Sequence, residues 1–198
     1  MKTAKQFWEF LKKDTWQSWI VSMLLIVIFI KFIFFPTISF VTNSPLPLVV
    51  VESCSRYHGN SFENWWKQNQ DKYENLEIEK EKFEEFKFKN GLTKGDIIFI
   101  WGRGEYKEGD IIIFNAVGQY AHPIIHRMIS TNPIETIGDN GITNPQQAPF
   151  EKNIQEQTIL GKSVIKIPLI GWVKLIFFEP FRESYDRGTC GMQMAKLQ

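Results

Sequence analysis

The chain has 198 residues, with 23 basic and 22 acidic side chains, so its net charge is close to zero. A near-neutral chain lacks a broad positive field, which argues against nucleic acid as a partner. The length suits one domain with appendages and allows a sizeable hydrophobic core. Two cysteines, Cys54 and Cys190, are too few for a disulfide framework or a metal site. A single bridge between them stays open as an alternative in an oxidising compartment.

A long apolar run opens the chain. Residues 19–35 are almost wholly apolar, with Lys31 as the one charge. About 20 such residues span the ~30 Å core of a bilayer. We therefore predict a transmembrane anchor over residues 16–41, with Trp16 and Trp19 at one interface. A buried core helix and a cleaved secretory signal are the alternatives; the run is long for the first and lacks a small-residue cleavage site for the second.

The charges that flank the anchor predict its orientation. Few basic residues closely follow the apolar run, whereas four lysines precede it: Lys2, Lys5, Lys12 and Lys13. Since positive segments stay in the cytoplasm, residues 1–15 are expected inside the cell. The predicted protein is thus single-pass in the cell membrane, with an extracytoplasmic domain over residues 42–180 and a C-terminal tail over residues 181–198.

The exported part begins with a short strand at residues 48–51. Residues 61–89 mix charges with aromatic side chains, which predicts a helical insert, expected to be solvated and without chemistry. Short strands punctuated by glycine and proline follow, over residues 94–101, 108–114, 123–129, 163–168 and 171–178. Their spacing predicts a mostly β fold class: an antiparallel β domain, sandwich or open barrel, with an N-terminal transmembrane helix and a helical insert.

Two serines, Ser53 and Ser55, stand where the first β-branched run stops. Serine is a weak nucleophile unless a base lies beside it. His126 is the candidate base, because it lies within a predicted strand between apolar neighbours and can be held rigidly. His58 is expected to point away from Ser55 along an extended chain, at ~10 Å.

Other polar residues have competing interpretations. His122 precedes a proline and is expected in a loop. Asp139 follows Gly138, so it could orient the imidazole of His126 or could simply cap a turn. Asp96 and Asp110 occupy similar Gly-Asp turns, and we interpret both as structural.

Four blocks of the sequence resemble type I signal peptidases in the order of that family. Ser53-Cys54-Ser55 resembles the serine block, with Ser55 in the nucleophile position. The segment 125–128 resembles the His-Arg block of the archaeal and endoplasmic-reticulum branch, where the bacterial branch has lysine. The segment 136–140 resembles the Gly-Asp-Asn block, and two segments resemble the closing strand region: 161–164 and 167–173. The resemblance covers roughly residues 18–60 and 92–178.

This resemblance implies a membrane-bound serine endopeptidase that removes signal peptides from exported precursor proteins. Its catalytic residues would be Ser55, His126 and Asp139, with Ser53 and the Ser55 backbone N–H stabilising the oxyanion. The implied partners are precursors and the lipid bilayer, with accessory subunits unknown. Neither a metal nor a cofactor is implied.

Departures from the family pattern motivate an alternative. Arg56 stands where the family has methionine, and Cys54 replaces a glycine. The second acid expected after the Gly-Asp-Asn block is absent from residues 142–146, where Asn144 could act as a hydrogen-bonding substitute. The alternative is a catalytically impaired homologue or accessory subunit that binds signal segments. A self-cleaving protease of the repressor family is a second rival, but that family is soluble and uses lysine.

Overall fold

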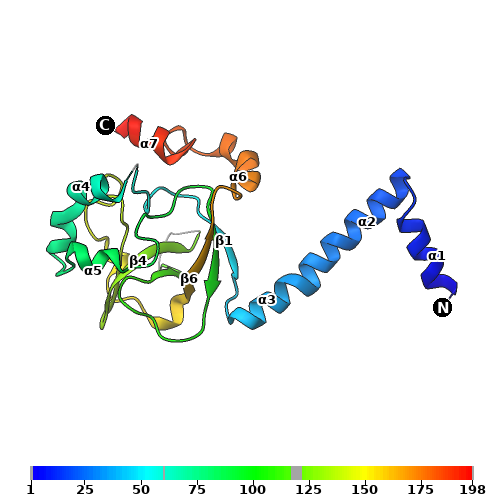
Figure 1. Cartoon of the computed structure of the whole chain (residues 1–198), viewed down its shortest axis with the longest axis horizontal. Helices are drawn as coiled ribbons and strands as arrows, with labels where there is room; N and C mark the ends of the chain where they lie inside the picture. The colour runs from blue at the N-terminus through cyan, green and yellow to red at the C-terminus, as the bar shows by residue number, and fades with distance from the viewer. Residues whose placement is uncertain (1, 60, 117–121, 198) are drawn as a thin grey trace. The chain divides into compact units, whose positions relative to one another are not determined.

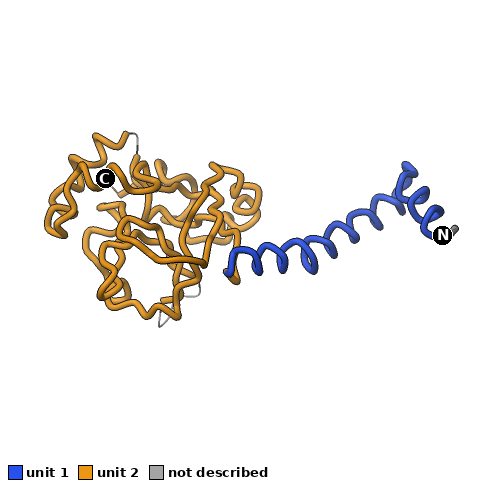
Figure 2. Tube along the Cα trace, turned by 60° about the horizontal axis from the view of Figure 1, so that its bottom comes forward, with its two compact units in different colours: residues 1–43 blue, residues 44–198 orange. Residues whose placement is uncertain are grey.

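The computed structural model describes residues 2–59, 61–116 and 122–197. The chain divides into two compact units, Met1–Asn43 and Ser44–Gln198, coloured separately in Figure 2. The predicted domain over residues 42–180 and the predicted tail over residues 181–198 therefore fall in the second unit, apart from residues 42 and 43, which belong to the first.

The first unit is helical throughout its apolar run. Its elements are α1 (Lys2–Leu11), α2 (Trp16–Phe29), a π-helical turn (Ile30–Phe34) and α3 (Phe35–Thr42). Pro36 has no N–H to donate within the helix. The helix continues through this position by way of the π-helical turn, in which the Phe35 N–H donates to the Ile30 carbonyl. Together Trp16–Thr42 form a continuous helix of 27 residues, which contains an 18-residue window of mean hydropathy 2.5 and is long and apolar enough to cross a membrane. This is the one such helix among the described residues, and it is consistent with a single-pass anchor.

The second unit is built on one six-stranded sheet with the order β1-β2-β6-β3-β4-β5, in which every neighbouring pair is antiparallel. The strands are β1 (Leu48–Val50), β2 (Ile97–Trp101), β3 (Ile111–Phe114), β4 (Ile124–Thr131), β5 (Ile134–Ile137) and β6 (Ile159–Ile167). The antiparallel sheet confirms that part of the prediction. The described strands all belong to this one sheet. Helical residues outnumber strand residues, so "mostly β" overstates the strand content.

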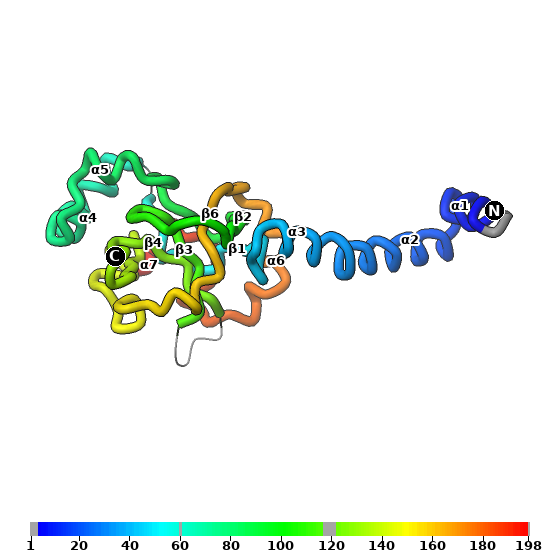
Figure 3. The backbone as a smooth tube through the Cα atoms, turned by 90° about the horizontal axis from the view of Figure 1, so that it is seen from below, coloured from blue at the N-terminus to red at the C-terminus, as the bar shows by residue number. Residues whose placement is uncertain are grey.

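The insert between β1 and β2 forms α4 (Phe62–Glu74) and α5 (Lys80–Glu84), which confirms the predicted helices. Figures 1 and 3 show the two helices together at one end of the unit, near β4. The expectation of a solvated insertion is wrong for its aromatic side chains. A cluster of buried side chains joins the insert to the sheet: Trp65, Trp66, Tyr73, Ile78, Phe83, Ile129 and Ile137. Burial of this aromatic surface makes the insert part of the core.

Residues 171–178, predicted as a strand, instead form the helix α6 (Trp172–Phe178). The ladder of β6 stops at Ile167 because Pro168 lacks an N–H and Leu169 has a φ of 61°. The following turn packs closely, since a Cβ on Gly171 would lie 2.6 Å from Val50 Cγ1. The remaining helices are α7 (Cys190–Leu197) and four short 3-10 turns, at Pro149–Glu151, Glu156–Thr158, Glu179–Phe181 and Ser184–Asp186.

A disulfide joins Cys54 to Cys190, with a Cα–Cα distance of 5.4 Å. The pairing that the sequence left open is therefore present. It connects residues separated by 136 positions, and closing a loop of that size stabilises a fold by about 2–5 kcal/mol. Both cysteines are buried beside Met194, so the start of α7 is fixed against the loop that carries the two serines.

Candidate active site

The serine loop, residues 53–58, follows β1 and lies against the Gly-Asp-Asn segment. The Ser53 and Ser55 hydroxyl oxygens are 3.2 Å apart, with Ser53 exposed and Ser55 partly exposed. The Asn140 N–H donates to the Ser55 carbonyl at 2.8 Å, and its side-chain amide donates to the Cys54 carbonyl at 2.9 Å. Asn140 therefore holds the serine loop through its backbone and makes no hydrogen bond to either hydroxyl.

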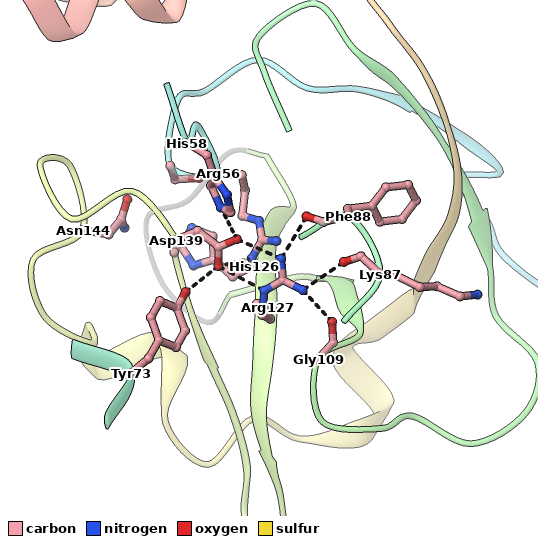
Figure 4. A network of polar contacts seen from close by, with 12 residues as sticks. Arg56, His58, Tyr73, Lys87, Phe88, Gly109, His126, Arg127, Asp139 and Asn144 are labelled. Atoms are coloured by element: carbon pink, nitrogen blue, oxygen red, sulfur yellow. Dashed lines mark hydrogen bonds and ion pairs between the residues drawn. The ribbon is translucent and has the colours of Figure 1, made fainter. Parts of the chain in front are cut away.

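Asp139 is the centre of a buried polar cluster, shown in Figure 4. Arg56 Nη1 donates to Oδ1 at 2.8 Å, and Arg127 donates through Nε at 3.2 Å and Nη2 at 3.0 Å. The Tyr73 hydroxyl donates to Oδ1 at 2.7 Å. His58 Nε2 lies 2.8 Å from Oδ2. The carboxylate thus joins the serine loop, β4, the end of β5 and the insert in one place.

The charges of this cluster compensate one another. Burial by itself raises the pKa of Asp139, but Arg127 and Arg56 outweigh it and hold that pKa well below 3.8. Burial lowers the pKa of Arg56 to about 10, so its guanidinium group remains charged near neutral pH. Arg127 also donates to the carbonyls of Lys87, Phe88 and Gly109. The arginine that departs from the family pattern is therefore paired rather than isolated.

Burial also acts on His58, whose ring stacks on Trp65 at 3.7 Å between centroids. It lowers the pKa of His58 below 6.5, although the hydrogen bond to Asp139 raises it. As pH falls below about 6.5, the unfolded chain gains a proton here that the folded chain does not, so stability falls. We expect His58→Phe to reduce this acid-side slope of the free energy of unfolding, measured by urea titration at several pH values. An unchanged slope would contradict a neutral, buried His58.

His126 lies on β4 opposite Ile112 of β3 and is buried. Its Nδ1 is 2.5 Å from Glu151 Oε1, and Glu151 is fully buried. Nε2 makes no hydrogen bond to the residues that the structure describes. Side chains alternate along a strand, so His126 and Arg127 face opposite sides of the sheet. Asp139, bonded to Arg127, makes no hydrogen bond to His126.

The sequence-predicted residues are thus only partly brought together. Ser53 and Ser55 form a pair, while no hydrogen bond joins Ser55 to His126 among the described residues. Asp139 bonds the neighbours of these residues, Arg56 and Arg127, instead of the imidazole. Asn144 makes local contacts: its side chain accepts from Thr143, and its carbonyl accepts from Lys72. Its suggested substitution for the missing acid stays a prediction.

Glu151 is the residue at this site that the sequence reasoning missed. It lies in a 3-10 turn with no motif of its own. One signal could have found it, since Glu151 is the first acidic residue after Asp139 in the chain. Asp96 and Asp110 agree with their structural interpretation, because each accepts the backbone N–H three residues before it.

Comparisons with known proteins give several relatives that are catalytic subunits of the signal peptidase complex. No protein-family model matches the chain. The signal peptidase complex catalytic subunit of Sclerotinia sclerotiorum is 29% identical over 113 residues, 51% of this chain and 65% of that protein. The corresponding subunit of Pyricularia oryzae is 27% identical over 115 residues, 52% of this chain and 66% of that protein. The Neurospora crassa subunit is 24% identical over 173 residues, 81% of each chain.

An antiparallel sheet that carries a serine pair and a buried histidine has the residue types from which serine peptidases are built. The comparisons are more particular: the chain is a distant homologue, at 24–29% identity, of the catalytic subunit of the signal peptidase complex. The resemblance to type I signal peptidases is confirmed at that level. The matched part of the Sclerotinia protein is 65% of its length, just under two thirds. These relatives are fungal, so they lend no support to the archaeal side of the expected branch.

Proposed function

We propose that this chain is a membrane-anchored serine endopeptidase that removes signal peptides from exported precursors. The observation that carries the proposal is the Asp139 clamp, by which we mean the Asp139 carboxylate bonded to arginines from two separate segments. One carboxylate bonds Arg56, which follows Ser55, and Arg127, which follows His126. It therefore ties the segments of the nucleophile and the base together, which supports a reacting geometry between residues distant in sequence. The homology to signal peptidase catalytic subunits supports the same reaction.

In the proposed mechanism, Ser55 Oγ attacks the scissile carbonyl while His126 Nε2 accepts its proton. The imidazole then donates that proton to the leaving amine, and water hydrolyses the acyl-enzyme. The oxyanion binds the Ser55 backbone N–H and the Ser53 hydroxyl. Two observations support this assignment. The Ser53 and Ser55 hydroxyl oxygens lie 3.2 Å apart, and the Ser55 N–H makes no hydrogen bond to the described residues, so it is available to an oxyanion. A movement that joins Ser55 to His126 would accompany substrate binding, since catalytic contacts often tighten only then.

The precursor is proposed to bind as an added strand along β1. This strand is an edge of the sheet and pairs with β2 on one side only. An exposed edge offers backbone donors and acceptors to an extended peptide, and alternate side chains set specificity. β1 leads directly into the serine loop, so a peptide paired with it would pass the reactive hydroxyls.

The anchor is proposed to confine enzyme and precursor to one surface. Residues 1–15 would lie in the cytoplasm and the second unit outside it, following the lysines before Trp16–Thr42. Sharing a membrane raises the effective concentration of a precursor whose signal segment is also embedded.

The direct test uses the full chain in phospholipid vesicles with a precursor that carries alanine before the cleavage position. We expect cleavage at that one bond, identified by mass spectrometry of both products. A precursor with tryptophan at the same position is the matched control and should stay intact. Binding without cleavage would favour the alternative, an impaired homologue or accessory subunit, for which the missing Ser55–His126 hydrogen bond is the motivating observation.

A further inference from the structure

The buried carboxylate of Glu151 has a contact that the sequence pattern did not assign. Its Oε1 lies 2.5 Å from His126 Nδ1, and its Oε2 accepts the Ala148 N–H at 2.6 Å. The side chain is fully buried and His126 is 4% exposed. A buried carboxylate is costly unless its oxygens are hydrogen-bonded, and here both oxygens have a donor.

The geometry decides which imidazole nitrogen carries the proton. An ionised carboxylate only accepts hydrogen bonds, so the Nδ1 facing Glu151 must carry the hydrogen. In the neutral ring this leaves the lone pair on Nε2, the nitrogen without a described partner. A base needs a free lone pair, and the position of the hydrogen on the far nitrogen is what provides it.

Asp139, the other acid near this region, is hydrogen-bonded to residues other than His126. Asp139 accepts hydrogen bonds from Arg56, Arg127 and Tyr73, and Arg127 faces the side of the sheet opposite to His126. The face of His126 carries Glu151 and the apolar side chains of the cluster Ile112, Phe114, Met128 and Ile154. Among the described residues, Glu151 is the one carboxylate that bonds this histidine.

We propose that Glu151 is the positioning residue of this site: it fixes the His126 tautomer and stabilises the imidazolium that forms when Ser55 gives up its proton. The inference rests on the proposed function, in which His126 is the base. The proton moves from Ser55 Oγ to His126 Nε2 and then to the leaving amine, while Glu151 keeps its hydrogen bond to Nδ1. Glu151, in the 3-10 turn that begins at Pro149, thus takes the place of the acid that is missing beyond the Gly-Asp-Asn segment.

The test compares Glu151→Gln and Glu151→Asp with wild type, as full chains in vesicles acting on the alanine precursor. Glu151→Gln keeps the size but can present a donor to Nδ1, so we expect kcat to fall by about 10²–10⁴-fold with KM within about twofold. Glu151→Asp keeps the charge and should recover part of that loss. Glu105→Gln is the matched control, because Glu105 is exposed and its side chain makes no hydrogen bond to the described residues, so it should retain wild-type kcat.

A second measurement does not depend on cleavage. Nuclear magnetic resonance of ¹⁵N-histidine-labelled protein should place the His126 ring hydrogen on Nδ1, with a strongly downfield proton signal that Glu151→Gln abolishes. A hydrogen on Nε2 in wild type, or a spectrum unchanged by Glu151→Gln, would overturn the inference. Full kcat in Glu151→Gln would also overturn it, provided Ser55→Ala is inactive. Full activity in Ser55→Ala would instead overturn the proposed function and leave the spectrum to decide the role of Glu151.

Discussion

Ser55→Ala is expected to reduce precursor cleavage by about 10⁴–10⁶-fold, to the background rate, because the acyl-enzyme cannot form without the hydroxyl. Ser55 is only partly exposed, and among the described residues its side chain hydrogen-bonds Ser53 alone. Losing that bond should leave the fold intact. The measurement is the initial rate of product formation from the alanine precursor by the full chain in vesicles, with thermal unfolding recorded in parallel.

Ser53→Ala provides the graded control for this prediction. Ser53 is proposed to donate to the oxyanion, and removal of one such donor costs about 10²–10³-fold in kcat. Ser53→Ala should therefore remain measurably active while Ser55→Ala does not. The reverse order would exchange the roles of the two serines, and wild-type rates in both variants would remove serine chemistry from this loop.

The parts of the fold that sequence could predict are those with strong local patterns. The anchor has an uninterrupted apolar run, and β2 and β3 each follow a Gly-Asp turn. Residues 171–178 have a composition that suits either a strand or a helix, and only the end of the β6 ladder at Pro168 decides between them. Likewise, the aromatic side chains of the insert are buried by partners on β4 and β5, which no local pattern reveals.

The candidate site divides in the same way. The serine block stands out because it closely follows an apolar run, and His126 stands out because it lies within a largely apolar strand; the order of the two resembles a known family. The partners of Asp139 and His126 depend on which face of β4 each side chain occupies and on how the chain returns to it. Glu151 reaches His126 through such a return, at a separation of 25 residues. Spacing alone could offer only an acid near the histidine, and Asp139 was the nearer in sequence.

Asp139→Asn is expected to destabilise the protein by about 3–5 kcal/mol, because two buried guanidinium groups would lose their counter-charge. Arg56 is 1% exposed and Arg127 is fully buried, so water cannot replace the carboxylate. The measurement is urea unfolding of the full chain in detergent, followed by tryptophan fluorescence. The low pKa of Asp139 adds a pH signature: its stabilisation persists at neutral pH and is lost as pH falls below about 4.

Asp110→Asn is the matched control, since Asp110 occupies a Gly-Asp turn and pairs with the less buried Lys162 at 2.8 Å. That pair should be worth at most about 1 kcal/mol. Combining Asp139→Asn with Arg56→Met should cost less than the sum of the two changes, because the double variant removes one unpaired charge. The role first predicted for Asp139, orienting His126, requires the opposite pattern: cleavage lost while stability is as little changed as in Asp110→Asn. The two outcomes separate a clamp that holds the serine loop to β4 from a group that acts on the imidazole.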